Sequence, residues 1–227
     1  MSWDRNAGGG SRVPRAQGGR RPFVRPPDDP PGTSRLFVAV PVAEDVRLAV
    51  GALMEEVAGA PIDRRAFGQP RWVRVDGLHL TLRFLGATPD AHQGDVAAAI
   101  VAAAQGTAPF RVVLSGGGAF PNAIRPRVLW LGIVEGADEL SALARRLGDL
   151  MAPLGWPPET RPLTPHLTLA RTDGVPGADE RARRLAEVAG DRRLEWGADR
   201  IILYKSILGH GPTHYESLAE ARLTEGA

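Results

Sequence analysis

The sequence predicts an α+β fold of two lobes, in which two mainly antiparallel sheets face a central cleft and helices pack outside them. The prediction depends first on the tetrapeptide His-Leu-Thr-Leu, which stands at 79–82 and again at 166–169. In each copy polar and apolar residues alternate, which is the period of a half-buried β-strand. The second observation is that strand, helix, proline-rich loop and His-x-Thr strand follow one another twice. Such self-similarity indicates a duplicated lobe, and a pseudo-twofold would turn both histidine faces toward one cleft.

The first half of the chain contains five predicted elements. Short apolar runs predict strands, and apolar residues at helical spacing predict helices. In order, these are a strand at 35–40, a helix at 46–58, the first His-Leu-Thr-Leu strand ending near Gly86, a helix opened by Pro89 and Asp90 that runs to Ala104, and a strand at 110–115. The three glycines at 116–118 are expected to form a sharp loop.

The second half repeats this order. An apolar run predicts a strand at 128–133, and Leu140, Leu143 and Leu147 form the stripe of a helix. A proline-rich loop then leads into the second His-Leu-Thr-Leu strand. The remaining expected elements are a helix at 179–188 and two strands, near 200–208 and 215–222.

Composition narrows the class of protein. The chain has 227 residues, of which 43% are hydrophobic and 24% charged, and it has no cysteine. These values are ordinary for a soluble globular protein, and a disulfide, a thiolate nucleophile or a cysteine-based zinc site is excluded. No apolar run is long enough to span a bilayer. We therefore expect a cytoplasmic protein with no membrane association, and we favour a monomer.

The N-terminal segment differs from the remainder of the chain. Residues 1–34 are rich in glycine, proline and arginine and carry six arginines against three aspartates. Such a segment buries too little apolar surface to offset its ordering entropy, so we expect a disordered tail followed by one two-lobed domain at 35–227. The remaining residues are close to neutral. A broad nucleic-acid-coating surface is therefore not indicated, and any nucleic acid is expected to be held locally, at an end or a single phosphate.

The repeated motif carries the candidate chemistry. Histidine exchanges a proton near neutral pH, and a threonine hydroxyl two residues along the same strand face can donate a hydrogen bond to an anion. A lone histidine on a strand is more often structural, but the recurrence of the whole motif favours function. His79 and His166 are thus candidate proton-transfer groups, and Thr81 and Thr168 are candidate anion-binding groups.

These motifs resemble those of the two-histidine (2H) phosphoesterases. Within that superfamily the chain is most similar to the RNA 2′,3′-cyclic phosphodiesterases, historically called 2′-5′ RNA ligases. The resemblance covers about residues 35–222. It is carried by both His-Leu-Thr-Leu copies and by the longer strings His-Leu-Thr-Leu-Arg-Phe-Leu-Gly at 79–86, Pro-Arg-Val-Leu-Trp-Leu-Gly at 126–132 and Pro-His-Leu-Thr-Leu-Ala-Arg at 165–171.

The resemblance implies a metal-independent hydrolysis with no cofactor, acting on RNA ends or cyclic nucleotides. Water attacks the phosphorus of a 2′,3′-cyclic phosphate and the bond to the 3′ oxygen breaks, which leaves a 2′-phosphomonoester. By the family pattern His79 is the proton donor and His166 the proton acceptor. Thr81 and Thr168 bind the non-bridging oxygens, and Arg171 contacts the phosphate.

The position of Arg171 poses a geometric problem. It lies five residues after His166, so an unbroken strand would turn it to the opposite face. A bulge or the end of the strand is required to bring it to the phosphate. Arg83, four residues after His79, is on the correct face by parity and is the alternative cation.

Three other patterns carry less weight. The pair His210 and His214 is separated by Gly211 and Pro212, which break a helix, so no metal site is expected there. The glycines at 116–118 lack the ending of a P-loop. Phe37 and Trp130 are expected to pack in the core rather than to stack on a base.

The motifs leave two other functions open. One is a non-catalytic module that binds RNA ends or nucleotides, and the other is 2′-5′ RNA ligation at the same site. The residues alone do not decide which histidine is the acid and which the base.

Overall fold

Two antiparallel sheets form the framework of the protein. The structure is a computed structural model, and it describes residues 30–59, 69–173, 175–207 and 213–225. The first sheet has the strand order β3-β1-β8-β9 and the second β2-β6-β5-β4-β7. Every pair of neighbouring strands in these two sheets is antiparallel. The predicted α+β class with mainly antiparallel sheets is confirmed.

The elements follow the predicted order with small shifts of their ends. The strands are β1 (Thr33–Pro41), β2 (Arg71–Trp72), β3 (His79–Pro89), β4 (Phe110–Phe120), β5 (Val128–Glu135), β6 (His166–Arg171), β7 (Leu194–Ala198), β8 (Arg200–Ile207) and β9 (His214–Arg222). The helices are α1 (Glu44–Ala58), α2 (Gln93–Ala104), α3 (Ala137–Met151) and α4 (Ala178–Ala189), with short 3₁₀ turns at Val75–Gly77, Asp90–His92 and Ala152–Leu154. None of the helices in the described residues has the length and apolarity that crossing a bilayer requires.

Three strands differ from the expectation, one of them the two-residue β2, which was not predicted. β1 begins at Thr33, inside the segment expected to be tail, and the Ser34 hydroxyl donates a hydrogen bond to Asp90 at 2.7 Å. β7 was not predicted, because its five residues, Leu-Glu-Trp-Gly-Ala, contain a glycine and only a brief alternation. Its Trp196 indole donates a hydrogen bond to the Pro41 carbonyl at 3.2 Å, which ties it to the end of β1.

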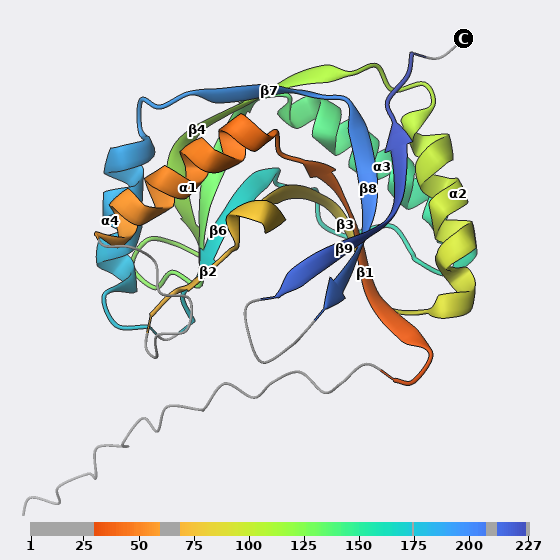
Figure 1. The fold of residues 1–227 in the computed structure, drawn as a ribbon, viewed down its shortest axis with the longest axis horizontal. Helices are drawn as coiled ribbons and strands as arrows, with labels where there is room; N and C mark the ends of the chain where they lie inside the picture. The colour runs from red at the N-terminus through yellow and green to blue at the C-terminus, as the bar shows by residue number, and fades with distance from the viewer. Residues whose placement is uncertain (1–29, 60–68, 174, 208–212, 226–227) are drawn as a thin grey trace, which may run out of the picture.

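The two halves of the sequence exchange elements. β8 and β9, from the second half, complete the sheet of β1 and β3, while β4, from the first half, pairs with β5. The helices exchange in the same way: α2 and α3 lie together over the first sheet, and α1 and α4 lie together at the second (Figure 1). Each lobe is therefore assembled from both sequence repeats, and neither repeat forms a lobe by itself.

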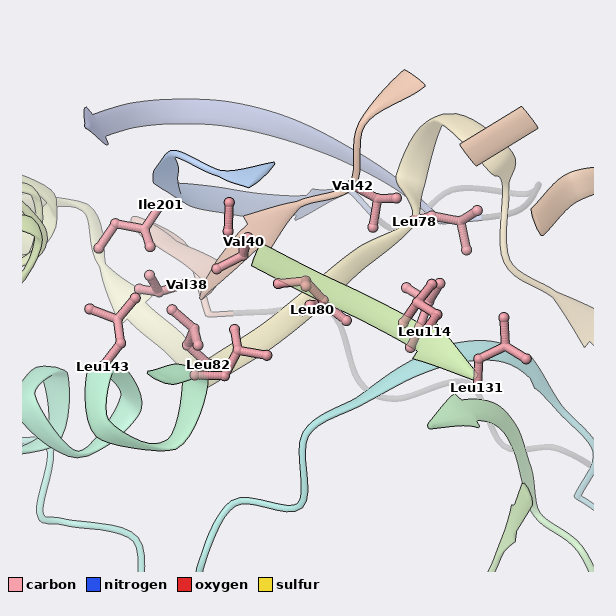
Figure 2. Packing of buried hydrophobic residues seen from close by; sticks show 14 of the residues in the cluster. Val38, Val40, Val42, Leu78, Leu80, Leu82, Leu114, Leu131, Leu143 and Ile201 are labelled. Carbon is pink, nitrogen blue, oxygen red and sulfur yellow. The ribbon is translucent and has the colours of Figure 1, made fainter. Parts of the chain in front are cut away.

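A single apolar cluster connects the two lobes. It contains Val38, Val40, Leu80 and Leu82 of the first sheet together with Leu114 and Leu131 of the second. Figure 2 shows these side chains gathered with Leu143 of α3. The leucines of the first His-Leu-Thr-Leu copy thus point into the core, and the alternation leaves His79 and Thr81 on the opposite face.

The glycines at 116–118 do not form the sharp loop that was expected. They continue β4, which bulges between Leu114 and Gly117 opposite β5. A Cβ on Gly117 would stand 2.6 Å from the Leu185 carbonyl oxygen of α4, and one on Gly118 would stand 2.3 Å from the Trp130 ring. These glycines allow a helix and an indole to pack directly on the strand backbone, a role that spacing alone does not reveal.

Candidate active site

The first histidine begins β3 and is enclosed by aromatic rings. The His79 ring centroid lies 4.7 Å from that of Phe37 and 5.1 Å from that of Tyr215, which meets it edge-on. Tyr204 lies 6.1 Å away. Nδ1 of His79 is 2.7 Å from the Gly77 carbonyl oxygen, so the neutral ring carries its proton on Nδ1 and leaves the lone pair on Nε2.

The second histidine begins β6 and is held in the same manner. Nδ1 of His166 is 2.7 Å from the carbonyl oxygen of Thr164, again two residues before the histidine. Phe120 meets the ring edge-on at 5.0 Å, and Trp130 lies at 6.3 Å. Both imidazoles thus have Nδ1 occupied by the main chain, which reserves Nε2 of each ring for chemistry.

The aromatic enclosure changes the protonation of His79. Burial lowers the pKa of His79 to about 4, and the hydrogen bond to Gly77 offsets only part of that effect. Burial also raises the pKa values of Tyr204 and Tyr215. The positive charge of Arg171 acts in the opposite direction on the pKa of Tyr215, so the electrostatic influence of β6 extends to a ring that touches His79.

A bulge terminates each His-Leu-Thr-Leu copy. In β6, Leu129 pairs with Ala170 and Trp130 with Thr168, so Leu169 is the extra residue. In β3, Val38 pairs with Arg83 and Ala39 with Thr81, so Leu82 is the extra residue. The residue after each bulge is buried, and the next one returns to the exposed face.

Arg171 could face the phosphate only if the strand were irregular, and the bulge in β6 is such an irregularity. Arg171 is exposed and lines a cavity of about 900 Å³ together with His166, Thr168 and Thr81. The structure therefore brings together four of the five candidate residues in one cavity. His79, two residues before Thr81 on the same strand face, lines a smaller cavity of about 200 Å³ with Tyr204 and Tyr215.

Arg83, the alternative phosphate-binding cation, does not lie on the exposed strand face where it was expected. The bulge at Leu82 shifts the parity, so Arg83 pairs with the core residue Val38 and is only 5% exposed. Its Nη2 donates hydrogen bonds to the carbonyl oxygens of Trp156, at 3.1 Å, and Pro157. Arg83 still contributes to the wall of the 900 Å³ cavity, but the neighbouring Phe84, which is 64% exposed, presents far more of its side chain there.

Several site residues were absent from the sequence prediction. Tyr204, Tyr215 and Phe120 lie far from the motifs in sequence, and only strand pairing and the aromatic contacts place them there. Phe37 is buried, as expected, but its ring lies under His79 rather than in the main core cluster. Trp130, which was expected to pack in the core, is instead only partly buried and lies beside Phe120 and His166.

The pattern His-x-x-x-His was not expected to bind metal. His210 lies outside the described residues, and His214 begins β9. No group of three or more histidine, aspartate or glutamate side chains that could hold a metal ion occurs in the described part of the chain.

Comparison with known families identifies a match over most of the chain. Residues 48–209 match the model of the 2′-5′ RNA ligase superfamily. Among curated proteins, the RNA 2′,3′-cyclic phosphodiesterase of Methanothermobacter thermautotrophicus is 32% identical over 168 residues, which are 74% of this chain and 85% of that protein. The enzyme of the same name from Thermotoga maritima is 29% identical over 192 residues, or 85% of this chain and 97% of that protein. The match to the Geobacillus stearothermophilus enzyme, at 29% identity, covers 82% of this chain but only 56% of its relative.

Solved structures agree with this match. A protein from Thermus thermophilus superimposes with a TM-score of 0.66 at 31% identity and covers 85% of this chain and 98% of its own. Escherichia coli LigT in complex with 3′-AMP superimposes with a TM-score of 0.63 at 25% identity, covering 85% of this chain and 99% of its own.

Proposed function

Because the chain belongs to the 2′-5′ RNA ligase superfamily, we propose that it hydrolyses RNA or nucleoside 2′,3′-cyclic phosphates to 2′-phosphomonoesters. The observation that carries the proposal is the matched support of His79 and His166. Two strands in different sheets present a histidine whose Nδ1 is tied to the main chain, each followed by a threonine that lines the same cavity. Binding alone does not require two such oriented imidazoles, whereas general acid–base catalysis does.

The reaction needs one proton to be removed and one to be supplied. His166 accepts a proton from the attacking water as its oxygen bonds to phosphorus. The bond from phosphorus to the 3′ oxygen breaks, and His79 donates a proton to that oxygen. Thr81, Thr168 and Arg171 donate hydrogen bonds to the non-bridging oxygens, where negative charge increases in the transition state.

The low pKa of His79 adds a condition to this mechanism. In the free enzyme His79 is neutral at pH 7, so a donor role requires that it take up a proton when substrate binds. The anionic phosphate supplies the reason, because a negative charge close to an imidazole favours the protonated ring. Binding of substrate and protonation of His79 are therefore coupled.

The cavity also offers a surface for the nucleobase. Phe84 stands at the position equivalent to Arg171 and exposes most of its ring at the cavity wall. Aromatic rings stack on bases with little sequence preference. We assign Phe84 to the base and Arg171 to the phosphate, so the same position in the two strands serves two parts of one nucleotide.

The test is incubation with a nucleoside 2′,3′-cyclic phosphate in excess EDTA, with products separated by chromatography. A 2′-phosphate is expected, and His79→Ala or His166→Ala should lower the rate on the order of 10²–10⁴-fold. Arg183→Ala is the control, because this exposed residue of α4 lies outside both cavities. A 3′-phosphate product would overturn the leaving-group assignment, and full activity of either alanine variant would overturn the paired mechanism.

Two other activities are distinguished by the same experiment. Ligation of a cyclic-phosphate end is the same displacement at phosphorus with the 5′-hydroxyl of a second RNA in place of water, so it requires an added 5′-hydroxyl strand. A non-catalytic nucleotide-binding module would protect the cyclic phosphate rather than cleave it. Hydrolysis of the mononucleotide without a second strand favours the phosphodiesterase.

Further proposals concern the domain boundaries, cellular location and oligomeric state of the enzyme. We propose that residues 35–227 are the catalytic domain and that the protein acts in the cytoplasm as a monomer. A chain lacking residues 1–32 keeps all of β1, so it is expected to retain activity and to elute as a monomer in size-exclusion chromatography.

A further inference from the structure

Arg83 fastens one end of a loop to the strand that carries His79. The loop, 156–165, connects the turn after α3 with β6, and we call it the strap. Arg83 donates to two carbonyl oxygens of the strap, those of Trp156 and Pro157. The Trp156 indole donates in return to the Leu85 carbonyl oxygen at 3.3 Å. Three hydrogen bonds thus join the start of the strap to β3.

The other end of the strap orients His166. The Thr164 carbonyl oxygen accepts the Nδ1 hydrogen bond that fixes the tautomer and direction of that ring. Between the two ends the strap carries several prolines, at 157, 158, 162 and 165. Each proline fixes its own φ and restricts the residue before it, so the strap has less freedom than an ordinary loop of this length.

The environment of Arg83 has features of a dedicated site. Its guanidinium is almost fully buried and forms no ion pair with a carboxylate among the described residues. The equivalent position in β6 is Ala170, which shows that the fold itself does not require an arginine after the bulge. Gly148 of α3 leaves room for it, since a Cβ there would lie 3.2 Å from Nη1.

We propose that Arg83 is a positioning residue that sets the orientation of His166 through the strap. Arg83 lies four residues after His79. Strand β3 therefore carries the first histidine and also holds the strap, which orients His166. This role rests on the proposed function of the two histidines. It accounts for an arginine that was expected to bind phosphate but that is almost fully buried at the cavity wall, with its Nη2 donating to the strap.

Two variants separate positioning from stability, and because Arg83 and Gly148 both line the 900 Å³ cavity, KM reports any direct effect on substrate binding. Arg83→Met retains length and apolar contact but removes the donors. Gly148→Ala retains the arginine and adds a methyl group against Nη1, while alanine favours a helix more than glycine does. Ile100→Ala is the control, since this buried residue of α2 lies outside the strap and both cavities.

The measurements are kcat and KM on a nucleoside 2′,3′-cyclic phosphate, the urea midpoint, and ¹⁵N NMR of the imidazoles. For Arg83→Met and Gly148→Ala we expect kcat to fall about tenfold or more with KM within about twofold, because misplaced catalytic groups lose rate rather than binding. The His166 signals should change from a single Nδ1–H tautomer to a mixture. Ile100→Ala should lower the urea midpoint and leave the tautomer unchanged.

The proposal is overturned if the Arg83→Met and Gly148→Ala proteins keep the wild-type kcat and the wild-type His166 tautomer, whatever their stability. If Arg83→Met does not fold, Gly148→Ala decides alone. If the wild-type protein turns over no cyclic phosphate, the proposed function fails, but the His166 tautomer in the variants still tests the role of Arg83.

Discussion

Phe84 occupies in β3 the position that Arg171 occupies in β6. Each residue follows its histidine by five positions, and each returns to the exposed face because a bulge precedes it at the second leucine of the motif. The duplicated strands therefore agree in their histidines and threonines and differ at this exposed, cavity-lining position. A site built on repeated strands becomes asymmetric there, which is the basis for assigning the base to Phe84 and the phosphate to Arg171 in the proposed function.

For the phosphate side, we expect Arg171→Met to lower kcat/KM by about tenfold to a hundredfold, because a charged hydrogen-bond donor to the phosphate is lost. Arg171→Lys should recover part of the loss, since lysine retains the charge without the planar fork. Steady-state kinetics on a cyclic mononucleotide measures both. The control is Arg183→Met on α4, whose exposed side chain pairs with Asp179 at 3.8 Å. Wild-type kcat/KM in Arg171→Met would mean that Arg171 is only a surface charge.

For the base side, Phe84→Ala should raise KM for nucleoside 2′,3′-cyclic phosphates about tenfold, because base stacking contributes about 1–3 kcal/mol. Phe84→Tyr should bind like the wild type. Ribose 2′,3′-cyclic phosphate, which has no base, provides the matched substrate and should show no effect of Phe84→Ala. An equal rise in KM for both substrates would mean that Phe84 supports the fold of the site rather than stacking on the base.

The pH dependence of the rate follows from the burial of His79. We expect a bell-shaped profile, because one imidazole must be neutral and the other charged. In kcat/KM, which reports on the free enzyme, the acidic limb should lie near pH 4, where the His79 ring titrates. In kcat the limb should move to higher pH, because the bound phosphate favours the imidazolium. An acidic limb in kcat/KM that remains near pH 6.5 would show that the aromatic enclosure does not hold His79 neutral.

The same pKa difference makes stability depend on pH. His79 has a pKa of about 4 when folded, against 6.5 for an ordinary histidine, so between these values the unfolded chain binds a proton that the folded chain does not. The free energy of unfolding should therefore decrease as the pH falls from about 6.5 to about 4, by at most about 3 kcal/mol from this group. Urea unfolding of wild type and His79→Gln across this range measures the difference. Parallel curves would contradict the shift.

The glycines of β4 give a prediction about packing. Gly118→Ala places a Cβ against the Trp130 ring, so we expect the free energy of unfolding to fall by about 1–3 kcal/mol. Gly197→Ala in β7 is the control, because its Cβ meets no heavy atom within 4 Å, and its effect should stay within about 0.5 kcal/mol. Urea denaturation compares the two. Equal stability of both variants would show that the indole moves away without cost.

The bulges explain why strand parity placed both Arg83 and Arg171 on the wrong face. Arg83 was expected on the exposed His79 face and is buried at the cavity wall, while Arg171 needed an irregularity and has one. Side-chain alternation is a local rule, and a single extra residue reverses it for every position that follows. Nothing in the tetrapeptide marks Leu82 or Leu169 as the extra residue. Pairing with Val38 and Trp130 on neighbouring strands decides it.

By itself the sequence determined the α+β class, the order of the main helices and strands, and the two histidine–threonine pairs, because these depend on local periodicity and on a repeated motif. Only the tertiary structure decided the exchange of β4, β8 and β9 between lobes and the placing of Tyr204 and Tyr215 against His79. It alone brought Arg83 to the strap. These relationships join residues far apart in the chain, and hydrogen-bond pairing and burial in three dimensions select them rather than any local pattern.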